Sequence, residues 1–259
     1  MKIPLYQIDA FTDRVFAGNP AAVCPLETWP GDDLMQFVAS ENNLSETAFF
    51  VGREGRYELR WFTPAAEVDL CGHATLATAH LIFSRLEPGL EKLAFETRSG
   101  TLQVEREGER LVMDFPALPG QPVAPPPALV AGLGIEPEAV LGADDYLALL
   151  ADEAAVRTLE PDFAALAQLD RRGLIVTAAG SDCDFVSRFF APRYGIPEDP
   201  VTGSAHCTLV PYWSARLGQS ELHARQLSAR GGELWCRDQG ARIKIAGQCA
   251  FFLQGEIDV

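Results

Sequence analysis

The sequence predicts an α+β protein made of two related halves, and two observations support this. First, strand-like segments alternate with helical ones, and two helical segments, residues 73–86 and 204–217, are apolar on most of their circumference. A helix of that kind is buried rather than laid on a surface. Second, each of these helices follows a strand and a loop of similar sequence. This indicates a duplicated fold with pseudo-two-fold symmetry.

The two repeated segments agree in order as well as in composition. Residues 60–64 read RWFTP and residues 188–192 read RFFAP. A short acidic loop follows each of them, and a glycine, Gly72 or Gly203, then precedes the buried helix. Chance similarity of two short segments is the alternative explanation.

In the first half, segments in which apolar and polar residues alternate predict strands, and apolar residues at helical spacing predict one further helix. A helix is expected after Asp32, and the Gly-Asn-Pro tripeptide at residues 18–20 is typical of a turn. Strands are expected over residues 3–11, 47–51 and 57–62.

The second half begins after a stretch that breaks regular structure. Residues 116–127 (PALPGQPVAPPP) are the best candidate for a linker. Pro211 lies inside the second buried helix and is expected to kink it. Beyond the linker we expect a helix at residues 163–167, strands at 173–179 and 186–190, and closing strands within 243–259.

Length, charge and cysteine content limit the function classes. A chain of 259 residues is long enough for two small domains. Its formal charge of −15 argues against nucleic acid and anionic membrane as partners, because both need a basic footprint. No apolar run spans a bilayer, and no signal peptide is visible, so we expect a cytoplasmic protein. The six scattered cysteines are then expected to be reduced thiols.

Two helix starts are candidates for binding an anion. Gly72 and Gly203 allow a sharp entry into a helix whose first N–H groups lack intrahelical partners. Such a helix end binds a carboxylate or a developing oxyanion. If a two-fold axis relates the halves, both starts face one cleft and form an anion clamp. Ordinary capping by Thr202 or Ser204 is the alternative.

Glu46 is the main candidate for proton transfer. It follows a polar run at residues 41–43 and directly precedes an apolar strand. A partly desolvated carboxylate at the mouth of a strand can have its pKa raised towards neutrality and exchange protons with a substrate carbon. A solvated loop glutamate is the alternative. Asp199 allows the same two interpretations, since it could simply cap a turn before Pro200.

Cys71 and His73 flank the first helix start. His73 is either a satisfied helix-start histidine or a second proton relay near Glu46. A thiol at a helix N-terminus has a lowered pKa, so Cys71 is either a base or a small buried residue. The second half has no cysteine at the matching place, and Cys207, one turn inside the helix, is expected to be buried.

Several motifs together resemble the PhzF-like isomerase family of phenazine biosynthesis, a branch of the diaminopimelate epimerase fold. They fall in order over most of the chain, from residue 1 to about 210, and are specific in combination. The motifs are DAFT (9–12), GNPAAV (18–23), LSETAF (44–49), CGHAT (71–75) and EDPVTGSAH (198–206).

The resemblance implies a fold and an assembly. Each lobe would be a curled, mostly antiparallel, barrel-like sheet wrapped around a central helix, with the active site in the cleft between the two lobes, and the protein would be a homodimer. The first lobe would comprise residues 1–117 and the second residues 118–259. Alternatively, residues 250–259 would form a strand that completes the sheet of the first lobe.

The resemblance also implies a reaction and its residues. The best-understood enzymes of this family isomerise trans-2,3-dihydro-3-hydroxyanthranilate. In these enzymes the glutamate of the S-E-T motif acts as both the acid and the base. That role falls on Glu46, with His73 and Asp199 as further catalytic residues. The substrate-binding residues would be Asn19, Ser45, Gly72, Gly203 and Ser204.

The sequence therefore predicts an isomerase that shifts a proton in a small carboxylate substrate without cofactor or metal. Cys71, His73 and His80 lack zinc-site spacing, and no nucleotide-binding glycine motif occurs. The first alternative is an amino-acid or hydroxy-acid racemase that uses Cys71, although Pro200 stands about where the epimerase branch has its second thiol. The second alternative is a non-catalytic ligand-binding or scaffold protein of the same fold.

Overall fold

The chain divides into two units in the computed structural model, which describes residues 1–259. Unit 1 comprises Met1–Asp114 and Ala246–Val259, and unit 2 comprises Phe115–Ile245. The end of the chain thus returns to the first unit, where the last strand pairs with the first. No helix is both long and apolar enough to span a membrane.

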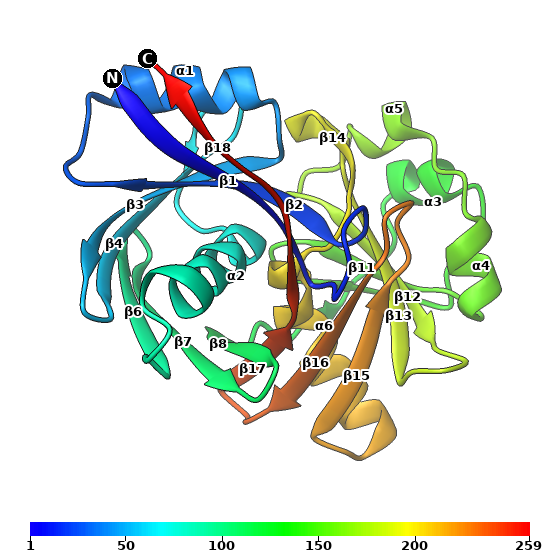
Figure 1. Ribbon diagram of the computed structural model, residues 1–259. Helices are drawn as coiled ribbons and strands as arrows, with labels where there is room; N and C mark the ends of the chain where they lie inside the picture. The colour runs from blue at the N-terminus through cyan, green and yellow to red at the C-terminus, as the bar shows by residue number, and fades with distance from the viewer. The chain divides into compact units, whose positions relative to one another are not determined.

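Unit 1 is a curled sheet that encloses one helix, α2 (Figure 1). Its elements in chain order are β1 (Lys2–Ala10), β2 (Asn19–Leu26), α1 (Asp32–Asn42), β3 (Glu46–Arg53), β4 (Arg56–Phe62), β5 (Glu67–Val68), α2 (Gly72–Leu81), the π-helical turn η1 (Ile82–Leu86), β6 (Lys92–Thr97), β7 (Gly100–Glu107), β8 (Arg110–Pro116) and β18 (Cys249–Asp258).

The strands of unit 1 pair mostly antiparallel. β1 lies between β18 and β2, and antiparallel pairs also join β3 to β4, β4 to β5, β6 to β7 and β7 to β8. The parallel pairs, β2 with β3 and β4 with β6, are the ones whose connections carry α1 and α2. Helix α2 packs against β1, β2, β3 and β18, and nearly all its side chains are buried, as its apolar sequence predicts.

Unit 2 has the same kind of architecture around α6. Its elements are β9 (Gln121–Pro122), α3 (Pro127–Leu133), β10 (Ala139–Gly142), β11 (Tyr146–Leu149), α4 (Glu153–Thr158), α5 (Phe163–Leu166), β12 (Leu174–Ala179), β13 (Phe185–Ala191), the 3₁₀ turn η2 (Pro192–Tyr194), β14 (Ile196–Asp199), α6 (Gly203–Leu217), β15 (Glu221–Gln226), β16 (Gly232–Asp238) and β17 (Arg242–Gly247).

Antiparallel pairing again dominates in unit 2. It joins β9 to β10, β10 to β11, β12 to β13, β13 to β14 and β15 to β16. β11 with β12 and β13 with β15 are parallel. Helix α6 packs against β15 and β16. The helix continues through Pro211, and its buried side chains include Leu209, Val210 and Trp213.

The predicted internal repeat is confirmed by one arrangement present in both units. On β4, Arg60 donates through Nε and Nη2 to the two carboxylate oxygens of Glu67 on β5, at 2.7 and 2.8 Å. On β13, Arg188 donates in the same way to Glu198 on β14, at 2.7 and 3.0 Å. In each unit a glycine then begins the buried helix.

Two expected elements differ from the structure. The first buried helix ends as an α-helix at Leu81, and the chain widens into the π-helical turn Ile82–Leu86, where the Glu87 N–H donates to the Ile82 carbonyl at 2.7 Å. The stretch predicted as a linker carries β9, which pairs with β10, and it leads directly into α3 at Pro127. Proline thus restricts these residues without excluding them from the sheet.

Candidate active site

Glu46 is the first residue of β3, at the point where the chain leaves α1. Helix α1 ends at a C-cap, Asn43, whose left-handed backbone (φ 49°) turns the chain towards the strand. Ser45, half-buried, directly precedes Glu46. On β3, Glu46 lies opposite Ala21 of β2. Its side chain is only 14% exposed, so the carboxylate is largely desolvated.

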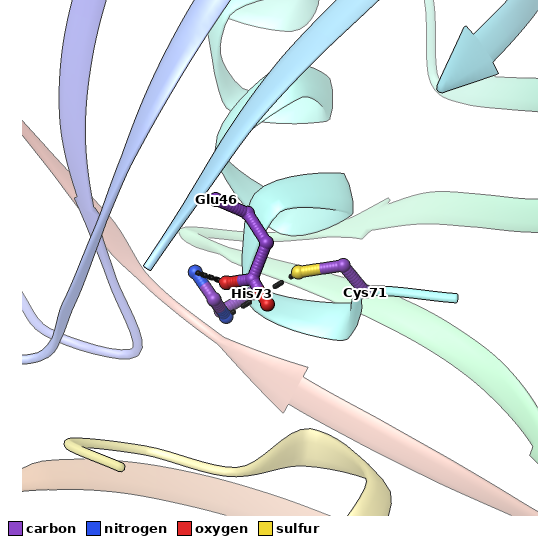
Figure 2. Close-up of side chains that lie close together, drawn as sticks. All are labelled: Glu46, Cys71 and His73. Atoms are coloured by element: carbon purple, nitrogen blue, oxygen red, sulfur yellow. Dashed lines mark hydrogen bonds and ion pairs between the residues drawn. The ribbon is translucent and has the colours of Figure 1, made fainter. Parts of the chain in front are cut away.

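His73, the second residue of α2, contacts this carboxylate. Its Nε2 lies 3.2 Å from Oε2 of Glu46 (Figure 2). Burial disfavours the imidazolium and lowers the pKa of His73 to about 3. The imidazole is therefore neutral at physiological pH, and the contact joins a neutral ring to a carboxylate rather than two opposite charges.

The other ring nitrogen of His73 decides where its proton lies. The amide nitrogen Nδ2 of Asn19, the first residue of β2, is 3.3 Å from Nδ1. An amide nitrogen only donates, so Nδ1 accepts and the ring proton lies on Nε2. The protonated ring nitrogen, Nε2, is thus the one that lies 3.2 Å from the Glu46 carboxylate. The motif residues Asn19, Glu46 and His73 thus meet in unit 1.

Cys71 completes the group from the residue before α2. Its Sγ lies 3.5 Å from Nδ1 of His73, and the side chain is buried. The ligand atoms of Glu46, Cys71 and His73 all lie within 4.8 Å of one another, so metal ligation has to be considered. In Figure 2 one dashed line joins the imidazole to Glu46 and another joins it to Cys71, and a different ring nitrogen makes each contact. This arrangement suits a hydrogen-bonded chain better than three ligands on one ion.

In unit 2, Asp199 ends β14 and is held by its neighbours. The Thr202 hydroxyl donates to Oδ2 of Asp199 at 2.5 Å. Gln226, a buried residue of β15, donates through Nε2 to the Asp199 carbonyl at 2.8 Å and accepts from the Thr202 N–H at 2.8 Å. The loop before α6 is therefore fixed by a buried amide that no sequence motif indicated.

The helix starts at Gly72 and Gly203 are not capped by side chains. Cys71 and Thr202 occupy the two N-cap positions, and neither side chain bonds to the helix N–H groups. The alternative of ordinary capping at these positions is thus not what the structure shows. Cys207 is buried, and burial raises the pKa of its thiol to about 12, which agrees with its expected packing role.

Ser204, the second residue of α6, has a partner that the sequence reasoning missed. Its Oγ accepts from Nη2 of Arg172 at 3.0 Å. Arg172 is itself bound to Asp145, a buried carboxylate, by Nε–Oδ1 at 2.9 Å and Nη2–Oδ2 at 2.5 Å. Arg172 lies in no motif, so it can be identified among the chain's arginines only when the position of Ser204 at the start of α6 is known.

Comparison with known proteins gives consistent matches. Residues 8–255 match the PhzC-PhzF family model, described as phenazine biosynthesis-like protein. An uncharacterized isomerase of Pseudomonas aeruginosa is 55% identical over 258 residues, which cover 99% of each chain. A crystal structure of a PhzF family phenazine biosynthesis protein from Enterococcus faecalis is 46% identical, with a TM-score of 0.97 and 100% of both chains covered. A predicted epimerase of Pseudomonas aeruginosa, 18% identical with a TM-score of 0.74 over 98% of this chain and 99% of its own, shares the fold.

Proposed function

This chain belongs to the PhzC-PhzF, phenazine biosynthesis-like family, and on that premise we propose that it is an isomerase that moves a proton within a small carboxylate substrate. The proposed reaction resembles the isomerisation of trans-2,3-dihydro-3-hydroxyanthranilate. Glu46 takes the proton from an acidified carbon and returns it to a conjugated carbon. No cofactor takes part in the proposed reaction.

The observation that carries the proposal is the contact between Glu46 and a neutral His73. The carboxylate of Glu46 is mostly desolvated and lies 3.2 Å from a ring nitrogen of His73, which is neutral, so this contact is not an ion pair. A carboxylate in such a place is suited to exchange a proton with a substrate carbon. General acid–base catalysis of this kind contributes roughly 10²–10⁴-fold. Positioning of the substrate and preorganised dipoles supply the remainder.

The other site residues have supporting roles in the proposal. His73 and Asp199 hold the substrate's amino or hydroxyl group, and Asn19 holds His73. The backbone N–H groups after Gly72 and Gly203 bind a carboxylate, since neither helix start is capped by a side chain. Ser45 and Ser204 complete substrate binding. The assignments of Ser45 and of the unit 2 residues rest on the family resemblance, as does the proposal of a cytoplasmic homodimer.

One observation favours a second candidate function. Cys71 lies 3.5 Å from Nδ1 of His73, close enough to exchange a proton through the ring, so a racemase with Cys71 as base remains the runner-up. Pro200 stands where the partner thiol would be expected. The proton-shift isomerase is favoured because Glu46 lies in the S-E-T motif that supplies the acid and base in the family that the chain resembles.

Proton NMR in deuterated water separates these functions. The purified protein is mixed with dihydro-hydroxyanthranilate and with a panel of amino and hydroxy acids. Deuterium uptake that accompanies movement of a double bond supports the isomerase. Uptake at a stereocentre without such movement supports the racemase. An absence of uptake in every compound would favour the non-catalytic alternative.

A further inference from the structure

The repeat between the units shows which residues of unit 2 take the places of Glu46 and His73. Strands β4 and β13 match through RWFTP and RFFAP, so Phe62 corresponds to Phe190. Thr47 lies opposite Phe62 on β3, and Leu174 lies opposite Phe190 on β12. The residues just before Leu174 therefore occupy the place that Ser45 and Glu46 occupy in unit 1.

The helix starts match in the same way. His73 and Ser204 each directly follow the first glycine of a buried helix. Two residues further on, Thr75 donates to the Cys71 carbonyl at 2.6 Å, and His206 contacts the Thr202 carbonyl through Nδ1 at 2.9 Å. Equivalent positions thus make equivalent bonds, which supports the alignment independently of the strand motif.

Near the counterpart of the catalytic pair, unit 2 has a guanidinium bonded to a hydroxyl. Gly173 takes the place of Glu46, and Arg172, at the place of Ser45, donates to Ser204, at the place of His73. Asp145, the residue before β11, holds Arg172 by two bonds. Unit 2 therefore has no carboxylate at the place of Glu46 and has a positive charge beside the start of its buried helix.

We propose that Arg172 binds the substrate's carboxylate together with Ser204 and the backbone N–H groups at the start of α6, and so helps to select substrates that carry a carboxylate. The proposal names the residues that select the substrate class, and for the identity of the natural ligand it rests on the proposed function.

The protein partners of Arg172 use only part of its guanidinium. The bonds to Asp145 and Ser204 use Nε and Nη2, which leaves both N–H groups of Nη1 for a ligand. The Arg172 side chain is 43% exposed, so a ligand can reach it. Because the Ser204 oxygen accepts from Arg172, its own O–H is available to donate. A forked guanidinium with a neighbouring hydroxyl matches the two oxygens of a carboxylate.

Asp145 has the role of holding the guanidinium in this direction. It is almost completely buried, and it would be an uncompensated charge without Arg172. Burial acts against the charge of Arg172, but the hydrogen bond and the charge of Asp145 raise its pKa above the usual arginine value. The cation is therefore permanent, and its orientation is set before the ligand arrives.

The test is equilibrium binding of benzoate, with benzamide as a neutral ligand of the same shape. We expect calorimetry to show binding of benzoate in preference to benzamide. Arg172→Gln should raise the Kd of benzoate by about 10- to 100-fold, Ser204→Ala by less, and neither should change the binding of benzamide. Arg157→Gln removes an exposed arginine of the same unit and is the matched control, with no expected change.

Further variants guard against loss of folding, and they separate the carboxylate site from the proposed isomerase function. Arg172→Gln leaves Asp145 without its partner, so Arg172→Lys and the double variant Arg172→Gln/Asp145→Asn test the same point with smaller disturbance. Glu46→Gln should abolish turnover and keep benzoate binding. If the wild-type protein turns over none of the proposed substrates but binds benzoate in a way that depends on Arg172, the proposed function is wrong and the carboxylate site is supported. Equal binding of benzoate and benzamide, or unchanged benzoate binding in all Arg172 variants, would overturn the site.

Discussion

At the scale of single residues, the account depends on which nitrogen of His73 carries the ring proton. Asn19 donates to Nδ1, so the ring proton is on Nε2, the nitrogen that lies 3.2 Å from Glu46. If the ring took the other tautomer, a lone pair would face the carboxylate and destabilise its charge. Asn19 is thus assigned to positioning as well as to the substrate contact expected from its motif.

Replacing Asn19 with leucine removes this control at similar volume. We expect kcat to fall by about 10- to 100-fold, because the base loses its preorganised neighbour, and KM to rise by less, because only one substrate contact is lost. Steady-state kinetics of Asn19→Leu check this. A rise in KM at constant kcat would instead assign Asn19 to substrate binding alone.

Cys71 separates the two candidate functions. An isomerase with Glu46 as the only proton carrier should keep turnover within about 10-fold in Cys71→Ala, whereas removal of a catalytic base costs about 10²–10⁴-fold. Cys207→Ala serves as the control for a buried thiol one turn inside the other helix. A loss of the larger size in Cys71→Ala alone would move the assignment to the racemase.

Some site residues could be predicted from the sequence and others could not. Glu46, His73 and Asn19 lie in motifs, and each motif falls at a strand or helix start, so their positions could be predicted. Gln226 contacts the site from β15 and Arg172 from two residues before β12, and neither lies in a motif. Their roles follow from long-range pairing, which a single sequence does not encode locally.

At the scale of elements, the loop between β14 and α6 is held by one buried side chain. Gln226 accepts from the Thr202 N–H and donates to the Asp199 carbonyl and the Thr202 hydroxyl. It therefore connects a strand of the sheet to the start of the buried helix, where Asp199 and Ser204 are presented.

Gln226→Ala should leave the Thr202 N–H buried without its partner. We expect the free energy of unfolding to fall by about 1–3 kcal/mol, together with a loss of kcat/KM, because the loop that carries Asp199 loosens. Urea denaturation and kinetics check both effects, and the exposed Gln103→Ala is the control. Unchanged stability would show that the loop is held by other contacts.

Element prediction succeeded where one physical signal dominated. The two buried helices were visible because they are apolar all round, and the strands before them alternate clearly. The end of the first helix was misjudged, since its residues remain good helix formers while the backbone widens into the turn Ile82–Leu86. Prolines hid the short strand β9 because they suit an edge as well as a linker.

At the scale of the whole molecule, two buried histidines, His73 and His206, and the half-buried His80 make stability depend on pH. Burial lowers the pKa of His73 to about 3, and of His80 and His206 to about 4. In the unfolded chain each histidine titrates near 6.5. Between these values the unfolded state binds more protons than the native state, so stability is fully present above about pH 6.5 and is lost as the pH falls.

The expected slope is about 1.4 kcal/mol per pH unit for each of these histidines between about pH 6 and pH 4. Urea unfolding at several pH values measures it. His206→Gln should lower stability at neutral pH and reduce the histidine contribution to the slope by about a third. An unchanged slope in that variant would mean that His206 is protonated in the native state.

The two ends of the chain meet in unit 1. This pairing joins the residues that lie farthest apart in the sequence. β18 pairs with β1 from Lys2 opposite Asp258 to Ala10 opposite Cys249. Alternation along residues 243–259 predicts strands, but it does not say which strand they join. Pairing partners depend on the closure of the whole sheet, which is why a sequence pattern alone could not assign them.

The central claim is that Glu46 carries the proton. The measurement is deuterium uptake from deuterated water into the dihydro-hydroxyanthranilate product, followed by proton NMR, for wild type, Glu46→Gln and the exposed control Glu41→Gln. We predict uptake with double-bond movement in wild type and Glu41→Gln, and a loss of at least about 10²-fold in Glu46→Gln. Near-wild-type uptake in Glu46→Gln would contradict the account.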